Sequence, residues 1–94
     1  MTLTRIELHQ LSGLRPVDYA VLARLAGAPW LWLPKTELIR GIYVTWSHLG
    51  KTLVGLERRG YVERVQAVTS GEVRVKLTDP GWEIWRTLRD LDRA

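Results

Sequence analysis

The chain has 94 residues, which suits one small domain with a single modest core, and we expect that domain to cover residues 1–94. It has no cysteine and two histidines, which excludes a disulfide framework and argues against structural zinc. No apolar run approaches the roughly 18 residues of a membrane span, and the N-terminus lacks the apolar core of a secretory signal. We therefore expect a cytoplasmic protein with no membrane partner.

The positive charge is concentrated in one part of the chain. The formal net charge is +4. Eight cations and four acids lie between Lys35 and Lys76, whereas six arginines and six acids lie outside that window. A local excess of this kind is the electrostatic footprint expected of a phosphate-binding surface. The alternative is a solvated surface that happens to be basic.

Two helices are predicted before residue 30. A Thr4-x-x-Glu7 capping box predicts a short helix within residues 1–14. Pro16 suits the first position of a second helix, because its missing N–H has no partner to lose there. We expect this helix from Val17 to Leu25 and assign it to the core. Its core side would carry Val17, Ala20, Val21 and Leu25.

The run from Trp30 to Leu33 lies between two prolines and predicts a short strand that pairs with a later hairpin. Packing is the favoured role of its tryptophans, and lining a ligand pocket is the alternative. Pro34 then opens a helix from Lys35 to Arg40 or Gly41. We expect Leu38, Ile39 and Ile42 to be buried, and Lys35, Thr36 and Arg40 to stay outside, within reach of phosphate.

The stretch from Thr45 to Arg59 predicts an amphipathic helix. The Thr45 hydroxyl can cap its first turn. Gly60 follows where a helix end needs left-handed backbone. Leu49, Leu53 and Leu56 recur at helical spacing and would be buried. The opposite side carries Ser47, Lys51, Val54 and Arg58, so it is predominantly polar and cationic.

After Gly60, two strands are predicted at Tyr61–Val68 and Glu72–Leu77, joined by the turn-forming residues 69–71. The second strand alternates, with Val73, Val75 and Leu77 on one side. The first strand alternates less regularly. For it we predict Val65 and Ala67 inward, with Arg64 and Gln66 outward.

A last helix is predicted at residues 80–92, with Asp79 as N-cap and Pro80 in its first turn. Its apolar stripe is too large for a terminal helix to leave in water. We expect it to join two copies of the chain as a homodimer, and the alternative is that it folds back on the helix of residues 17–25. The stripe consists of Ile84, Trp85, Leu88 and Leu91.

Two segments carry a resemblance to a known family. Leu56-Glu57-Arg58-Arg59-Gly60-Tyr61-Val62 resembles the LExxGxV signature of the MarR and PadR families of winged-helix transcription regulators. Residues 75–81 resemble the v.LT..G segment that closes the wing in those families, and residues 37–45 follow the helix-turn-helix pattern. The similarity extends over residues 15–92. One departure is Tyr43, at a turn position that is often glycine, so the turn could be longer than usual and the start of the recognition helix could shift by a residue or two.

The resemblance implies an α+β winged helix-turn-helix fold with a three-helix core, a two-stranded β-wing and a C-terminal helix. It also implies a dimeric, repressor-like transcription regulator that binds double-stranded DNA in the nucleoid of a bacterium or archaeon. Helix 45–59 would read the major groove, and wing 62–77 would contact the backbone or minor groove. The DNA-binding candidates are Lys35, Thr36, Arg40, Thr45, Trp46, Ser47, His48, Gly50, Lys51, Arg58, Arg64, Arg74 and Lys76.

Four aromatic residues have alternative roles. Trp46 could belong partly to the core, and His48 could be structural or solvated. Similar regulators often bind small aromatic compounds between the DNA-binding lobe and the dimer helices, where Trp30 or Trp32 could line the site. No cofactor is expected.

Other function classes fit the sequence less well. Neither histidine lies in a catalytic motif, and there is no glycine-rich phosphate loop, so we do not expect an enzyme. A winged-helix protein-interaction module would keep the same core, but the cationic side around Lys51 and Arg58 favours DNA. An architectural or partition DNA-binding protein remains the other alternative.

Overall fold

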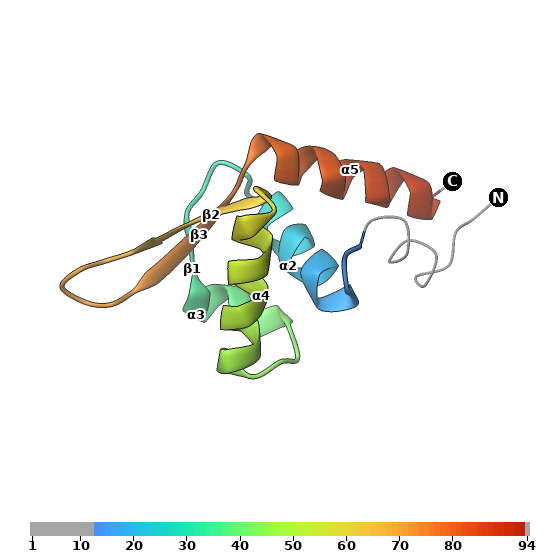
Figure 1. The fold of residues 1–94 in the computed structure, drawn as a ribbon. Helices are drawn as coiled ribbons and strands as arrows, with labels where there is room; N and C mark the ends of the chain where they lie inside the picture. The colour runs from blue at the N-terminus through green and yellow to red at the C-terminus, as the bar shows by residue number, and fades with distance from the viewer. Residues whose placement is uncertain (1–12, 94) are drawn as a thin grey trace.

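The computed structural model describes residues 13–93, so the helix predicted within residues 1–14 lies outside the described residues. Three antiparallel strands form a sheet in the order β1-β3-β2, and helices pack around its base (Figure 1). None of the helices in this part of the chain is long and apolar enough to cross a membrane. The elements are α2 (Pro16–Ala26), β1 (Leu33–Pro34), α3 (Lys35–Leu38), η1 (Ile39–Gly41), α4 (Trp46–Arg58), β2 (Val62–Gln66), β3 (Val73–Leu77) and α5 (Asp79–Arg93). This arrangement confirms the predicted α+β winged helix.

The core forms around α2, where it meets α3, α4, β3 and α5. The predicted stripe of Leu49, Leu53 and Leu56 is fully buried, as is Leu38 of α3. On α2 the apolar face is wider than predicted, because Leu22 is also fully buried. The reason is that α2 is covered from several sides, by α3, α4, β3 and α5.

The strand predicted at Trp30–Leu33 is wrong over most of its length, since β1 covers Leu33 and Pro34 alone. The backbone N–H of Leu31 donates to the carbonyl of Ala28 at 3.0 Å, so these residues form a turn. Trp30 lies in that turn and is 70% exposed. Pro34 has no N–H to extend a ladder, and α3 begins at the next residue, so β1 stays short.

The inward side predicted for the first wing strand is also wrong. Val62 is buried and pairs with Leu77, which places Arg64 on the same side as Val75. Val65 pairs with Arg74 on the other side and is 49% exposed, and Ala67 is exposed. The hairpin of β2 and β3 extends away from the helices (Figure 1), so most of β2 meets no core that would impose a hydrophobic alternation.

The start of α5 differs by one residue from the prediction, because the cap is Thr78 rather than Asp79. The Thr78 hydroxyl accepts from the Gly81 N–H at 3.1 Å and donates to the Gly60 carbonyl at 2.6 Å. The Thr78 N–H donates to the Tyr61 carbonyl at 3.1 Å. One residue therefore joins the start of α5 to the residues that precede β2, which Asp79 could not do from inside the helix.

The helix α5 packs against α2 in the same chain (Figure 1). Leu88 is 4% exposed and belongs to the core, while Ile84 and Trp85 are half-buried against it. Leu91 is 36% exposed. The stripe predicted for dimerisation is thus partly covered by folding back on α2, and Leu88 has no free surface to offer a second copy.

Candidate nucleic-acid interface

The helix α4 presents a polar outer side. Its first residue is Trp46, so the exposed Tyr43 in the preceding turn does not delay the helix. The Thr45 hydroxyl accepts from the His48 N–H at 3.1 Å, which confirms the predicted cap. At the other end, Gly60 has a φ of 80°, the left-handed backbone expected after the helix. Between these ends Ser47, His48, Lys51 and Arg58 are all exposed.

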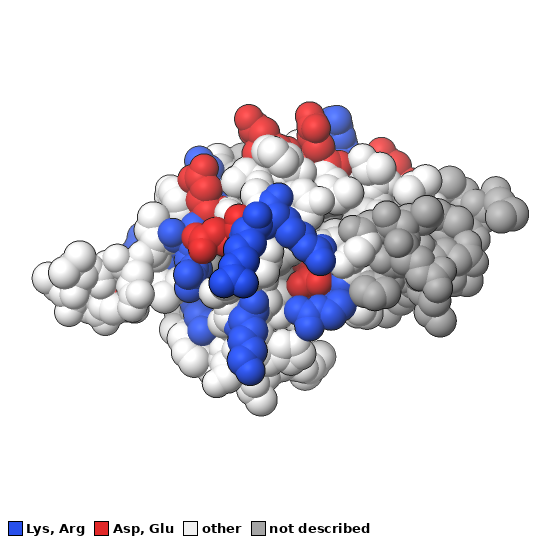
Figure 2. Space-filling model, viewed as in Figure 1, with Lys and Arg blue, Asp and Glu red and all other residues white. Residues whose placement is uncertain are grey.

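The cationic side chains around α4 differ in whether they already have an ion-pair or hydrogen-bond partner. Lys and Arg side chains form a row over α4, and several acidic side chains gather along α5 (Figure 2). Arg40 is paired with Glu37 at 3.5 Å. Among residues 13–93, the side chains of Lys51 and Arg58 have no ion-pair or hydrogen-bond partner. These two cations can therefore meet a phosphate without giving up a contact.

The wing does not hold its three cations on one side. Arg64 lies on the side of Val75 and meets Glu57 of α4 at 3.4 Å. Arg74 and Lys76 project from the other side of the hairpin. Arg74 is paired with Glu72 at 3.2 Å. Exposed pairs of this kind contribute at most about 1 kcal/mol, so phosphate could displace the carboxylates.

Lys35 is the predicted site residue that the structure places differently. We expected it outside, but it is 9% exposed, whereas Thr36 and Arg40 are exposed as predicted. Its side chain lies beside the start of α4, and its Nζ is 4.0 Å from the centroid of the Trp46 ring. Burial of the ammonium, and then the positive charge of Arg64, lower the pKa of Lys35.

Trp46 and Gly50 lie between core and surface. Trp46 is 49% exposed, so it is neither a core residue nor a free one. Gly50 is half-buried, and a Cβ atom there would lie 3.1 Å from Lys35 Nζ. The lysine is buried because a glycine one turn into α4 leaves room for it.

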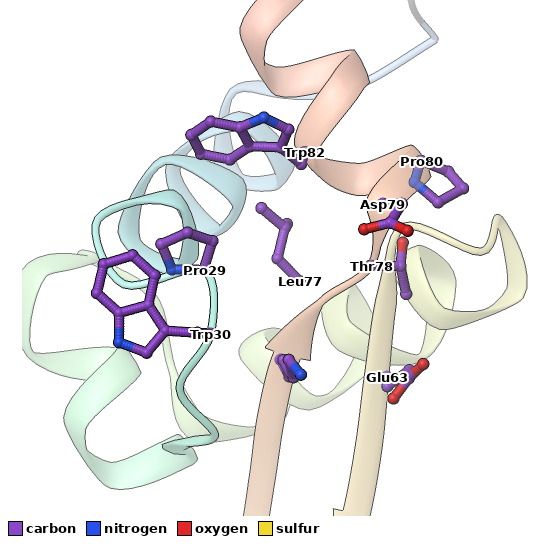
Figure 3. A pocket seen from close by; sticks show the side chains of 9 residues that line it. Pro29, Trp30, Glu63, Leu77, Thr78, Asp79, Pro80 and Trp82 are labelled. Carbon is purple, nitrogen blue, oxygen red and sulfur yellow. The ribbon is translucent and has the colours of Figure 1, made fainter.

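An open groove of about 680 Å³ lies at the base of the hairpin (Figure 3). Figure 3 shows Pro29 and Trp30 on one side of β3, with Glu63, Thr78 and Asp79 on the other. Lys76, Leu77, Pro80 and Trp82 complete the lining. Of the two tryptophans predicted for a ligand site, Trp30 lines the groove and Trp32 does not; Trp32 lies 5.9 Å from Lys76 Nζ.

Trp82 lines the groove although we predicted no role for it from the sequence. Its ring centroid lies 5.5 Å from that of Trp85, and it joins the groove to the core. The signal was present, because residues three apart on a helix share a face. As for metal ligation, the described residues contain no group of three or more His, Asp or Glu side chains that could hold an ion.

No protein-family model matches the chain, and no curated protein is similar to it in sequence. Solved structures of transcription regulators are similar. One is a MarR-family regulator from Silicibacter pomeroyi, with 28% identity and a TM-score of 0.79 over 90% of this chain and 56% of the other. The PcaV regulator from Streptomyces coelicolor, bound to its natural ligand, has 24% identity and a TM-score of 0.75 over 88% and 60%.

A third similar structure contains DNA. The MepR–DNA complex from S. aureus has 14% identity and a TM-score of 0.80 over 92% of this chain and 70% of the other. The chain therefore has the winged-helix fold of the MarR-family regulators. It spans 56–60% of the length of the first two proteins.

Proposed function

We propose that the chain is a sequence-specific, double-stranded DNA-binding transcription regulator of the MarR type, acting as a repressor on the DNA of a bacterial or archaeal cytoplasm. The observation that carries this proposal is the outer side of α4. It is capped by Thr45 and exposes Ser47, Lys51 and Arg58, and its two cations have no partner within residues 13–93. The fold shared with a DNA-bound regulator supports the same role.

The proposed contacts follow from the order of residues along α4. A helix meets base edges with its N-terminal half and the backbone with cations at its margins. Ser47, His48 and Lys51 lie in that half, beside Trp46 and the small Gly50. Arg58 lies at the far end of α4, and Thr36 and Arg40 are exposed on α3 and η1, so these three would meet phosphates. In the wing, Arg64 would face the DNA with α4, while Arg74 and Lys76 would need a backbone on the other side of the hairpin.

This proposal predicts a strong salt dependence. Each phosphate that the protein neutralises adds about 0.9 to the slope of log affinity against log salt concentration. Fluorescence anisotropy of a labelled mixed-sequence duplex, titrated with the chain at several salt concentrations, should show steep weakening. An affinity that does not change with salt would favour the protein-interaction module, since that class needs no phosphate contacts.

The proposal includes a two-fold dimer, in which two recognition helices would lie about one DNA turn, near 34 Å, apart. The apolar surface available for the dimer is smaller than predicted, because Leu88 is buried within one chain. Leu91, at 36% exposure, and the half-buried Ile84 and Trp85 remain as the apolar surface of α5 that a second copy could cover. The symmetry of the preferred DNA site tests this part of the proposal.

We also propose that a small aromatic effector occupies the groove of Figure 3. Trp30 and Trp82 offer ring faces, and Glu63 and Asp79 offer acceptors for a phenolic hydroxyl. The groove touches both the base of the hairpin and the start of α5, so an occupant could alter the position of the wing. The PcaV structure supports the general idea, since it holds that regulator's natural ligand.

Titration with a panel of phenolic compounds should change the tryptophan fluorescence for at least one member. Trp30→Leu should abolish that response, because it removes one wall of the groove, whereas Trp32→Phe, outside the lining, should preserve it. A flat response across the panel would contradict the effector and favour a constitutive DNA binder.

A further inference from the structure

The contact between Lys35 and Trp46 joins the first residue of α3 to the first residue of α4. The ammonium lies 4.0 Å from the ring centroid, which is well within the range of a cation–π interaction. The lysine is 9% exposed, and among residues 13–93 it has no carboxylate partner. The aromatic ring is thus the group that compensates this buried cation.

The second feature of the contact is the space in which the ammonium lies. Trp46, Gly50 and Glu57 recur at spacings of four and seven residues, so they share one side of α4. Glu57 on that side meets Arg64 of β2. A Cβ atom at Gly50 would approach Lys35 Nζ to 3.1 Å, so the ammonium lies where a side chain would otherwise project. Lys35 therefore adjoins both of the first two turns of the recognition helix.

The energetics show why such a contact would fix the helix start. Moving an ammonium out of water costs free energy. A cation–π interaction stabilises the ammonium most strongly when the cation is desolvated. The pKa of Lys35 is lowered, so burial and the nearby Arg64 still disfavour the charge. If Trp46 moved away, the buried cation would lose its main compensation. The contact therefore favours the observed position of Trp46, although this residue is half exposed.

We propose that Lys35 is a positioning residue for DNA recognition, which fixes Trp46 and the first turn of α4 without itself contacting a phosphate. This inference rests on the proposed function, because it assigns a role within that interface. The first turn also carries Ser47 and His48, which would meet base edges, so an error in its placement would alter base discrimination. Arg40 and Arg58 would instead act on the DNA backbone directly.

The test compares two variants that each remove one positive charge. Lys35→Met keeps most of the length of the side chain and loses the ammonium, and Arg58→Met is the matched control on the exposed end of α4. For Lys35→Met we expect an unchanged salt slope and about a tenfold loss of discrimination between the preferred duplex and a scrambled one. For Arg58→Met we expect the reverse, a slope lower by about 0.9 with discrimination preserved. A lower slope for Lys35→Met would show a phosphate contact and overturn the inference.

A second arm needs no DNA. Urea unfolding of Lys35→Met, Trp46→Leu and the double variant should give effects that are not additive, with a coupling of about fivefold or more in the unfolding equilibrium constant. Additive effects would overturn the contact itself. If the unmodified chain binds no duplex, the proposed function and the role of Lys35 in recognition are both overturned. The coupling between Lys35 and Trp46 would still be measurable by urea unfolding. The two failures are therefore distinguishable.

Discussion

Replacing Lys51 and Arg58 together with alanine is expected to weaken DNA binding about a hundredfold. Each is an exposed cation without a partner among residues 13–93, and a charge-assisted contact of about 1.4 kcal/mol corresponds to a factor of ten. Seven residues of helix separate them by about 10 Å, so the losses in binding free energy from the two substitutions should be roughly additive. Anisotropy titrations at fixed salt would measure the loss, and the salt slope should fall by up to about 1.8.

The control for this experiment removes the same number of charges from another element. Arg86 and Arg89 lie on α5, outside the proposed DNA contacts, but Arg89 lies 4.8 Å from the centroid of the Trp85 ring, in the surface proposed for the dimer. On a duplex long enough for one copy only, their joint replacement by alanine should change the affinity by less than about threefold. If both double variants weakened binding equally, the affinity would reflect net charge alone, and the assignment of α4 as the DNA-reading element would be wrong.

Replacing Gly81 with alanine is expected to destabilise the fold by about 3 kcal/mol. A Cβ atom there would overlap the carbonyl oxygen of Tyr61 and lie 3.0 Å from a methyl carbon of Leu77. The first turn of α5 would have to move away from the hairpin, which would also strain the hydrogen bonds of Thr78 to Gly60 and Gly81. Urea unfolding followed by circular dichroism would measure the change.

Gly55→Ala is the matched control for this substitution. Gly55 lies within α4, and a Cβ atom there would meet nothing within 4 Å. Alanine should therefore stabilise the fold by about 0.5–1 kcal/mol through its higher helix propensity. Similar effects at both positions would contradict the close approach of α5 to Tyr61.

The sequence predicts α4 well because everything that defines this helix is local. Thr45 caps it, three leucines recur at helical spacing, and Gly60 supplies the left-handed backbone that ends it. The local sequence also predicted Asp79 as the N-cap of α5. Thr78 takes that role, because its hydroxyl also reaches the Gly60 carbonyl, a group 18 residues earlier in the chain.

The errors concern residues whose surroundings come from distant parts of the chain. Lys35 is buried because Gly50 leaves space for it, and nothing near Lys35 in the sequence indicates that space. Val65 is exposed because Val62 fixes the phase of β2 and the rest of that strand lies beyond the core. The exposed polar side of α4 could be predicted, whereas the division of the wing cations between two sides depends on strand register.

We propose that two copies of α4 recognise double-stranded DNA in a sequence-specific manner. Selection of bound duplexes from a random pool with the purified chain tests it most directly, because one experiment measures binding, preference and symmetry. We predict enrichment of an inverted repeat whose half-sites lie about one helical turn apart. Retention of no duplex, or recovery of a pool without any enriched sequence, would contradict the claim.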